Sequence, residues 1–383
     1  MPLKDDGFGV SVKRSFAGLR RAFFIPPFTV LRVMDGRWMT RKRAWLRLGI
    51  KSELGRGEEN LLKMSEAANR QQCEGSKNKN KNKNTGAFAG AMGLVLGRPC
   101  DLRGSYKRLN KAQRKAEVHG LTFRATGFMA EEMLKRGGGT SIFDPVLCEL
   151  MYRWFCPVGG QVIDPFAGGS VRGIVASVLD FRYWGSELRP EQVESNREQA
   201  KEIVPDNQPV WACGDAAEVL SDAPEADFIF SCPPYGNLEK YSELTGDLSN
   251  MTYSEFRIAY RDIITKSVGR LRDNRFACFV VSNFRDENGF YNDLVGDTVR
   301  AFRRAGMSYY NEAVLVTATG SLPIRVGRQF QAGRKLGKTH QNVLVFYKGD
   351  PKRIKDEFGL LDHNAEENGD EGGEEEEIED AEV

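Results

Sequence analysis

Between residues 140 and 350, short apolar runs alternate with amphipathic segments, and this alternation restricts the possible folds more than any other feature of the chain. The runs expected to be strands are rich in β-branched and aromatic residues and cover Gln161–Asp164, Arg182–Glu187, Val210–Cys213, Ala226–Ser231, 276–281, 313–317 and 342–347. The helices expected among them cover 171–179, 191–203, 253–271 and 291–305. Strands that alternate with helices predict an α/β fold with a mainly parallel sheet and helices on both faces. Ligands of such sheets bind at the carboxyl ends of the strands.

Charge is distributed unevenly along the chain. Residues 1–120 hold 26 Lys and Arg against 10 Asp and Glu, whereas residues 362–383 hold 12 Asp and Glu and no Lys or Arg. We therefore expect a basic and aromatic N-terminal region (1–120), a folded domain (121–350) and a disordered acidic tail (362–383). The low-complexity Lys/Asn run at 75–85 has no apolar face to bury. The basic region favours a polyanionic partner, although solvated surface charge is the simpler alternative.

Several classes of protein are disfavoured by composition. The seven cysteines are odd in number and include no CxxC pair, so we expect neither a disulfide framework nor a zinc site. Three scattered histidines do not suggest a metal cluster. The apolar residues near the N-terminus are stopped by Pro26 and Pro27, well short of the roughly 20 residues that span a bilayer. The expectation is a cytoplasmic protein with neither a metal nor a membrane partner.

The first candidate motif follows the strand at Gln161–Asp164 and consists of Asp164, Pro165, Phe166, Ala167, Gly168, Gly169 and Ser170. Glycines at a strand-to-helix turn let the backbone bend sharply and approach a ligand. Glu187 ends the next strand, where an acid typically accepts hydrogen bonds from ribose hydroxyls. Asp215 follows the third strand and could accept from an adenine amino group. Each feature alone is also typical of an ordinary turn or a surface charge, but together they favour an adenosyl ligand.

The second candidate motif follows the fourth strand and consists of Ser231, Cys232, Pro233, Pro234 and Tyr235. Two consecutive prolines fix φ and remove two amide donors, which leaves carbonyl oxygens free to accept hydrogen bonds. A flat ring that bears an amino group would stack on Tyr235 and donate to the carbonyl of Pro233. Its position after the next strand beyond the glycine-rich loop, Glu187 and Asp215 makes this motif the main indication of catalytic function.

These motifs resemble those of the DNA amino-methyltransferase family, which makes N6-methyladenine or N4-methylcytosine. Residues 164–169 resemble the family's cofactor loop, 232–235 its catalytic tetrapeptide and 340–349 its closing strand. Phe143 and Asp144, with the helix after them, resemble the element that helps hold the methionine part of the cofactor. The resemblance implies a seven-stranded Rossmann-like fold, S-adenosylmethionine as cofactor and a flipped base in double-stranded DNA. With the basic N-terminal segments, the chain is also similar to phage and prophage DNA methylases.

The chain departs from the family pattern at two places. The cofactor loop reads Gly169-Ser170 where the family usually has a glycine at the second position. Cys232 replaces the usual Asp, Asn or Ser, and a thiol is a weak hydrogen-bond partner. Either Ser231 or Cys232 therefore supplies the polar contact, and the choice between cytosine and adenine stays open. A nucleophilic Cys232 in carbon-5 cytosine methylation is disfavoured because Pro follows this cysteine rather than precedes it.

Two basic segments are candidates for DNA contact. Arg41, Lys42 and Arg43 lie between Trp38 and Trp45, a mixture suited to phosphate contact and stacking, or else to an amphipathic helix that packs on the core. A loop between the last two expected strands carries Arg325, Arg328, Arg334, Lys335 and Lys338. It is expected to clamp the DNA backbone or to form a solvated hairpin.

The favoured function is site-specific DNA methylation on an exocyclic amine. The same chemistry on an RNA base or a protein glutamine is the first alternative, since similar Pro-Pro-Tyr turns serve those substrates. A DNA-binding protein without catalytic activity is the alternative from another class.

Overall fold

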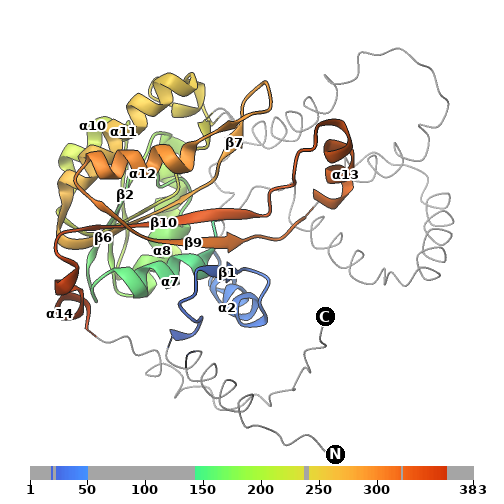
Figure 1. Ribbon diagram of the computed structural model, residues 1–383. Helices are drawn as coiled ribbons and strands as arrows, with labels where there is room; N and C mark the ends of the chain where they lie inside the picture. The colour runs from blue at the N-terminus through green and yellow to red at the C-terminus, as the bar shows by residue number, and fades with distance from the viewer. Residues whose placement is uncertain (1–18, 20–22, 51–142, 237–240, 321, 360–383) are drawn as a thin grey trace, which may run out of the picture. The chain divides into compact units, whose positions relative to one another are not determined.

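The computed structural model describes residues 19, 23–50, 143–236, 241–320 and 322–359 (Figure 1). The main sheet is built from β1 (Val30–Arg32), β2 (Gln161–Asp164), β3 (Arg182–Glu187), β4 (Val210–Cys213), β5 (Ala226–Ser231), β6 (Leu271–Val281), β9 (Ser308–Val316) and β10 (His340–Lys348). The α-helices are α2 (Gly36–Arg47), α7 (Pro145–Phe155), α8 (Val171–Val178), α9 (Pro190–Ile203), α10 (Ala216–Val219), α11 (Tyr253–Arg270), α12 (Leu294–Arg304), α13 (Leu322–Gly333) and α14 (Ile354–Phe358). A two-stranded hairpin consists of β7 (Phe284–Arg285) and β8 (Tyr291–Asn292).

The strand order of the main sheet is β1-β9-β10-β6-β5-β2-β3-β4. Among these strands only β10 runs against the rest, because it pairs antiparallel with both β6 and β9 while the other pairs are parallel. Helices α7 and α8 cover one face, and α11 and α12 cover the other (Figure 1). The expected fold class, a mainly parallel sheet with helices on both faces, is confirmed.

The strands and helices expected between residues 161 and 348 are present, and most of their bounds agree within three residues. Strands β6 and β9 each begin five residues earlier than expected, and the residues Tyr291–Asn292, expected in a helix, form β8. Strand β1 was not expected, and it pairs parallel with β9 from Val30↔Val314 to Arg32↔Val316. Three residues give no measurable period, so a short edge strand of this kind leaves little signal in the sequence. Part of the N-terminal region thus extends the sheet. The low-complexity run at 75–85 and the acidic tail at 362–383 lie outside the described residues.

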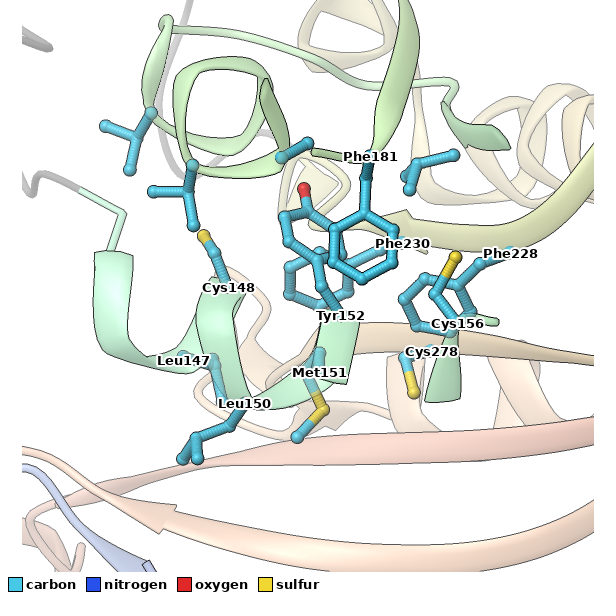
Figure 2. Close-up of a cluster of buried hydrophobic side chains, with 14 of the residues drawn as sticks. Leu147, Cys148, Leu150, Met151, Tyr152, Cys156, Phe181, Phe228, Phe230 and Cys278 are labelled. Atoms are coloured by element: carbon cyan, nitrogen blue, oxygen red, sulfur yellow. The ribbon is translucent and has the colours of Figure 1, made fainter. Parts of the chain in front are cut away.

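Alternating side chains of the strands fill two cores. Phe228 and Phe230 of β5 point to the α7 face, where Tyr152 packs edge-on against both rings at centroid distances of 6.3 and 5.5 Å (Figure 2). Ile229, between them, points to the opposite core under α11 and α12. This alternation follows from the period of two in a strand, and burial on both faces accounts for the continuous apolar runs.

The chain order creates a switch point at the centre of the sheet. From β2 the chain proceeds outward through β3 and β4, whereas β5 and β6 lie on the other side of β2. The segments that leave the carboxyl ends of β2 and β5 therefore diverge, and ligands of open α/β sheets bind at such switch points. Both predicted motifs begin at these two strand ends. In the described part of the chain, no helix is long and apolar enough to cross a membrane.

Candidate functional site

Asp164, at the end of β2, holds the two motifs together. Its carboxylate accepts hydrogen bonds from Arg172 Nε (2.5 Å), the Tyr183 hydroxyl (2.7 Å), the Ser231 hydroxyl (2.5 Å) and the Phe166 amide (3.1 Å). Its exposed fraction is 0%. This buried carboxylate positions the loop and the turn on either side of the switch point, and the predicted contact of Asp164 with a cofactor stays a prediction.

Arg172, on α8, supports the glycine-rich loop by hydrogen bonds to its backbone. Its guanidinium donates to the carbonyls of Phe166 (2.5 Å) and Ala167 (2.9 Å) and lies 4.5 Å from the ring centroid of Phe143. Burial disfavours the charged form of Arg172, but the carboxylate of Asp164 outweighs it, so the pKa of Arg172 is raised. One buried cation thus fixes the loop and Phe143, both of which were predicted to contact the cofactor.

The glycine-rich loop is also fixed to the end of β3. The Ala167 amide donates to the Ser186 carbonyl (2.9 Å), and the Ser186 hydroxyl donates to the Pro165 carbonyl (2.9 Å). Gly168 adopts φ +53°, and no atom lies within 4 Å of where its β-carbon would be. The left-handed conformation explains the glycine, and the open space above it leaves the backbone accessible to a ligand.

A ladder of amide side chains on α9 supports this loop and was missed by the sequence analysis. Asn196 Nδ2 donates to the Gly168 carbonyl (2.8 Å), Gln192 Nε2 donates to Asn196 Oδ1 (2.9 Å), and the Ser170 hydroxyl donates to Gln199 Oε1 (3.1 Å). The three amide residues are spaced i, i+4 and i+7 and therefore share one face of the helix. This spacing is the sequence feature that could have predicted a row of amide side chains on one face of α9. Ser170 is buried in this contact, which accounts for its departure from the family pattern.

Glu187 and Asp215 lie at the ends of the next two strands, as predicted. Glu187 Oε1 accepts from Arg189 Nε (3.2 Å), and its side chain is 12% exposed. Burial raises the pKa of Glu187, although Arg189 and a hydrogen bond from the backbone of Gly168 oppose the shift. Asp215 is half-buried and caps α10 by accepting from the Ala217 amide (2.8 Å). The structure thus brings Glu187 next to Gly168, and the ligand contacts of both acids stay predictions.

In the Pro-Pro-Tyr turn, the structure separates the two candidates for the polar contact. Ser231 is fully buried, and its hydroxyl donates to Asp164, which leaves its predicted contact with the target amine a prediction. Cys232 is half-buried, and its Sγ lies 3.6 Å from the Tyr235 hydroxyl oxygen. The thiol is therefore the side chain that the turn offers. Gln341, on β10, donates from Nε2 to the same phenol oxygen at 2.8 Å and was not singled out from the sequence.

The rest of the turn is held by packing. Pro233 is buried and Pro234 half-buried. Gly236 adopts φ +56°, and a β-carbon there would lie 2.5 Å from Phe284 Cζ, so only glycine fits. Burial also raises the pKa of Tyr235 well above its usual range, which keeps the phenol neutral. The turn therefore offers backbone carbonyls, a thiol and a neutral aromatic ring.

Helix α2 packs against α7 through polar contacts. Asp144, at the start of α7, accepts from Trp38 Nε1 (3.1 Å) and pairs with Lys42 Nζ (2.8 Å). It also caps its own helix by accepting from the Val146 amide (3.0 Å). These contacts give Asp144 a role in joining the two helices, whereas a role in cofactor binding had been predicted.

One turn further along, α2 makes a second set of contacts with α7. Arg41 forms a bidentate pair with Glu149 at 2.8 Å for both hydrogen bonds, and Trp45 Nε1 donates to the same carboxylate at 2.7 Å. Both Trp38 and Trp45 are buried. The amphipathic alternative is therefore the one observed, and the expectation that these tryptophans stack on bases is wrong. Arg43 is exposed, and its predicted phosphate contact stays a prediction.

The segment between β9 and β10 contains helix α13, where a loop was expected. Leu322, Val326 and Phe330 recur every four residues, and Gly337 packs against the first two. This apolar stripe explains the helix. Arg325 lies in the helix, but its side chain is not described.

The other predicted cations of this segment are placed by the structure. Arg328, Arg334 and Lys335 are exposed, and Arg334 lies 5.3 Å from the Phe330 ring centroid. Lys338 is half-buried and donates to the Asn283 carbonyl at 3.3 Å. Since α13 connects the carboxyl end of β9 to the start of β10, these cations belong to the edge of the sheet that carries both motifs. Within the described ranges, no group of His, Cys, Asp or Glu side chains could hold a metal ion.

Neither a family model nor a curated protein sequence matches this chain. Solved structures similar to it include TrmN from Thermus thermophilus, with 18% identity, a TM-score of 0.37 and coverage of 54% of this chain and 49% of that one. The chain thus spans about half the length of TrmN. Magnesium protoporphyrin IX methyltransferase from Synechocystis shows 13% identity, a TM-score of 0.37 and coverage of 59% and 93%. A structure described as a DNA modification methylase from Thermus thermophilus shows 18% identity, a TM-score of 0.27 and coverage of 36% and 51%.

The fold and the site define an α/β protein whose candidate ligand site lies at a sheet switch point. The glycine-rich loop follows β2 and the Pro-Pro-Tyr turn follows β5, the two strands that meet at this point.

Proposed function

We propose that the chain is an S-adenosylmethionine-dependent methyltransferase that methylates the N4 amine of cytosine or the N6 amine of adenine in DNA. The observation that carries the proposal is the 2.5 Å hydrogen bond between Ser231 and Asp164. It couples the start of the glycine-rich loop to the start of the Pro-Pro-Tyr turn, so a donor held by one would face an acceptor held by the other. The choice of DNA rests on the resemblance of these two motifs to those of the amino-methyltransferases.

The residues around the loop fit the cofactor. Gly168 leaves its backbone open, Glu187 would accept from the ribose hydroxyls, and Asp215 would accept from the adenine amine. Phe143, held against Arg172, would contact the methionine part. When bound, the cofactor would supply an electrophilic methyl group on a sulfonium: the N–CH3 bond would form as the S–CH3 bond breaks, with S-adenosylhomocysteine as the leaving group and the amine proton lost to water.

The Pro-Pro-Tyr turn would orient the base. Its ring would stack on Tyr235, whose hydroxyl is held by Gln341, and its amino group would donate to the Pro233 carbonyl and to the sulfur of Cys232. These acceptors increase the electron density on the nitrogen without a charged base. Catalysis would then come chiefly from positioning and fixed dipoles. The base must leave the duplex, at a cost of a few kcal/mol.

The basic surfaces would hold the DNA backbone. The candidates are the exposed Arg43 on α2 and the cations in and after α13, namely Arg325, Arg328, Arg334, Lys335 and Lys338. We assign target recognition to the N-terminal region (1–120) and catalysis to residues 121–350. Each phosphate neutralised would add to the salt dependence of binding.

The test is to incubate the protein with unmethylated duplex DNA and S-adenosylmethionine, digest the DNA and identify its nucleosides by mass spectrometry. N4-methylcytosine or N6-methyladenine is the expected product. Parallel reactions with RNA and with protein test the alternative substrates. Cofactor binding without a methylated nucleoside would refute DNA as the substrate, and no cofactor binding would refute the enzyme.

Variants of Cys232 separate the amine mechanism from a covalent one. Cys232→Ser keeps a polar acceptor and should retain methyl transfer to the amine. Complete loss in Cys232→Ser, together with 5-methylcytosine as the product of the unmodified protein, would instead indicate a nucleophilic thiol.

A further inference from the structure

The β7–β8 hairpin projects from the edge of the sheet that carries the candidate site (Figure 1). It follows the carboxyl end of β6, the strand beside β5. At its base, Phe284 is buried and packs against Gly236, the residue that ends the Pro-Pro-Tyr turn. The hairpin is therefore anchored directly on the proposed base-binding turn.

The tip of the hairpin exposes two aromatic side chains. Phe290 is 73% exposed and Tyr291 is 49% exposed. The backbone below them is well fixed, because Asp286 and Phe290 exchange hydrogen bonds of 2.8 Å and Arg285 donates to the Gly289 carbonyl at 2.8 Å. Two exposed aromatic side chains on an ordered turn are available for stacking on nucleic-acid bases.

Cations surround this tip and come from two segments of the chain. The Arg285 guanidinium lies 4.1 Å from the Tyr291 ring centroid, and Lys338 Nζ lies 5.7 Å from it. The Lys335 ammonium packs against Gly289 so closely that a β-carbon there would collide with it. The exposed carboxylate of Glu287 opposes these charges. Aromatic rings among cations are the combination that binds nucleic acid through stacking and phosphate contact.

We propose that this hairpin is a DNA contact in which Phe290 stacks on the bases beside the flipped nucleotide while Lys335 and Lys338 contact the flanking phosphates. The proposal rests on the proposed function, since it places the hairpin next to a base held by the Pro-Pro-Tyr turn. Phe290 is hydrogen-bonded to Asp286 across the hairpin. Asp286 lies two residues after Phe284, so the ring of Phe290 lies about 7 Å along the strand from the base of the hairpin. That length equals about two stacked nucleotides, so the ring can reach the position that the flipped base leaves.

Binding assays test the proposal independently of methyl transfer. The probes are a fluorescein-labelled mixed-sequence duplex, the same duplex with one abasic position, and an RNA duplex of the same sequence, all measured by fluorescence anisotropy with the full chain. Because base–aromatic stacking contributes about 1–3 kcal/mol, Phe290→Ala should weaken DNA binding about 5- to 140-fold. The unmodified protein should prefer the abasic duplex, whose gap admits the ring without unstacking, and Phe290→Ala should lose this preference. Phe290→Trp should keep it.

Two further variants complete the design. Lys335→Gln should lower the slope of binding against salt by about 0.9, the value for one phosphate, and should leave the abasic preference intact. Val158→Ala is the control, because it truncates an exposed apolar side chain just before β2, at the opposite edge of the sheet, and should change nothing.

The outcomes separate this proposal from the proposed function. If Phe290→Ala binds both DNA probes like the unmodified protein while DNA is still methylated, the hairpin assignment is overturned and the enzyme assignment stands. If the abasic preference depends on Phe290 but no methylated nucleoside forms, the contact stands and the methylation proposal fails. Binding of RNA but not DNA would overturn the assignment of the partner.

Discussion

The buried pair of Asp164 and Arg172 gives the sharpest test of the arrangement at the switch point. Asp164→Ala leaves the guanidinium of Arg172 buried without its carboxylate, and breaking a buried pair in this way costs about 3–5 kcal/mol. The hydroxyls of Tyr183 and Ser231 lose the same acceptor, so the free energy of unfolding should fall by at least the lower value of this range. At about 2–4 °C per kcal/mol for a unit of this size, a loss of about 3 kcal/mol lowers Tm by about 6–12 °C.

The assay is urea denaturation with a double-mutant cycle. Asp164→Leu combined with Arg172→Met removes both charges and should recover part of the stability, because no unpaired charge remains. Asp262→Ala is the matched control, since it breaks an exposed i, i+4 pair with Lys266 and should cost only about 0.3–0.5 kcal/mol. If Asp164→Ala costs no more than Asp262→Ala, the carboxylate is not the buried hub described above, and the reasoning fails.

Three other predictions test the glycine-rich loop, the Pro-Pro-Tyr turn and Glu187. Gly168→Ala places a β-carbon on a left-handed residue, so calorimetry should show weaker S-adenosylmethionine binding and denaturation a loss of roughly 1–2 kcal/mol; unchanged values for both would refute the strain. Gln341→Leu leaves the Tyr235 hydroxyl without its amide partner and should lower kcat while cofactor affinity stays constant; an unchanged kcat would show that the phenol needs no support. Burial raises the pKa of Glu187 above its usual 4.5, so the folded protein holds that proton more tightly and its stability should fall as pH rises from 4.5 through the raised pKa. Glu187→Gln should remove this fall in urea midpoint, and an identical pH profile in both proteins would contradict the shift.

Much of the sheet was predictable because its strands are buried on both faces. Runs such as Ala226–Ser231 are mostly apolar and are buried along their whole length, and amphipathic helical segments separate them. Both the fold class and the edge that carries the site follow from this pattern. The positions of Glu187 and Asp215 at neighbouring strand ends follow from the same logic.

What the sequence did not predict depends on contacts between distant residues. The bidentate pair of Arg41 with Glu149 joins residues 108 positions apart. Without knowledge of that partner, the sequence of the basic segment is as compatible with a DNA contact as with a helix that packs on the core. Strand β1 is too short to show a period, and it forms because β9 offers an open edge. The same holds for Gln341, whose partner Tyr235 lies 106 positions away.

A contact that the sequence could not show bears on the choice between Ser231 and Cys232. Successive side chains of an extended segment point to opposite sides, and the Ser231 hydroxyl donates to Asp164. The Cys232 thiol, the weaker hydrogen-bond partner, is therefore the side chain that we propose for contact with the amine. An amine bound there would depend mainly on the Pro233 carbonyl and on the ring of Tyr235, both of which act through position and not through charge. This is the physical reason why Gln341, which fixes that ring without reaching the base-binding carbonyl, should affect the rate of the reaction more than the binding of the cofactor.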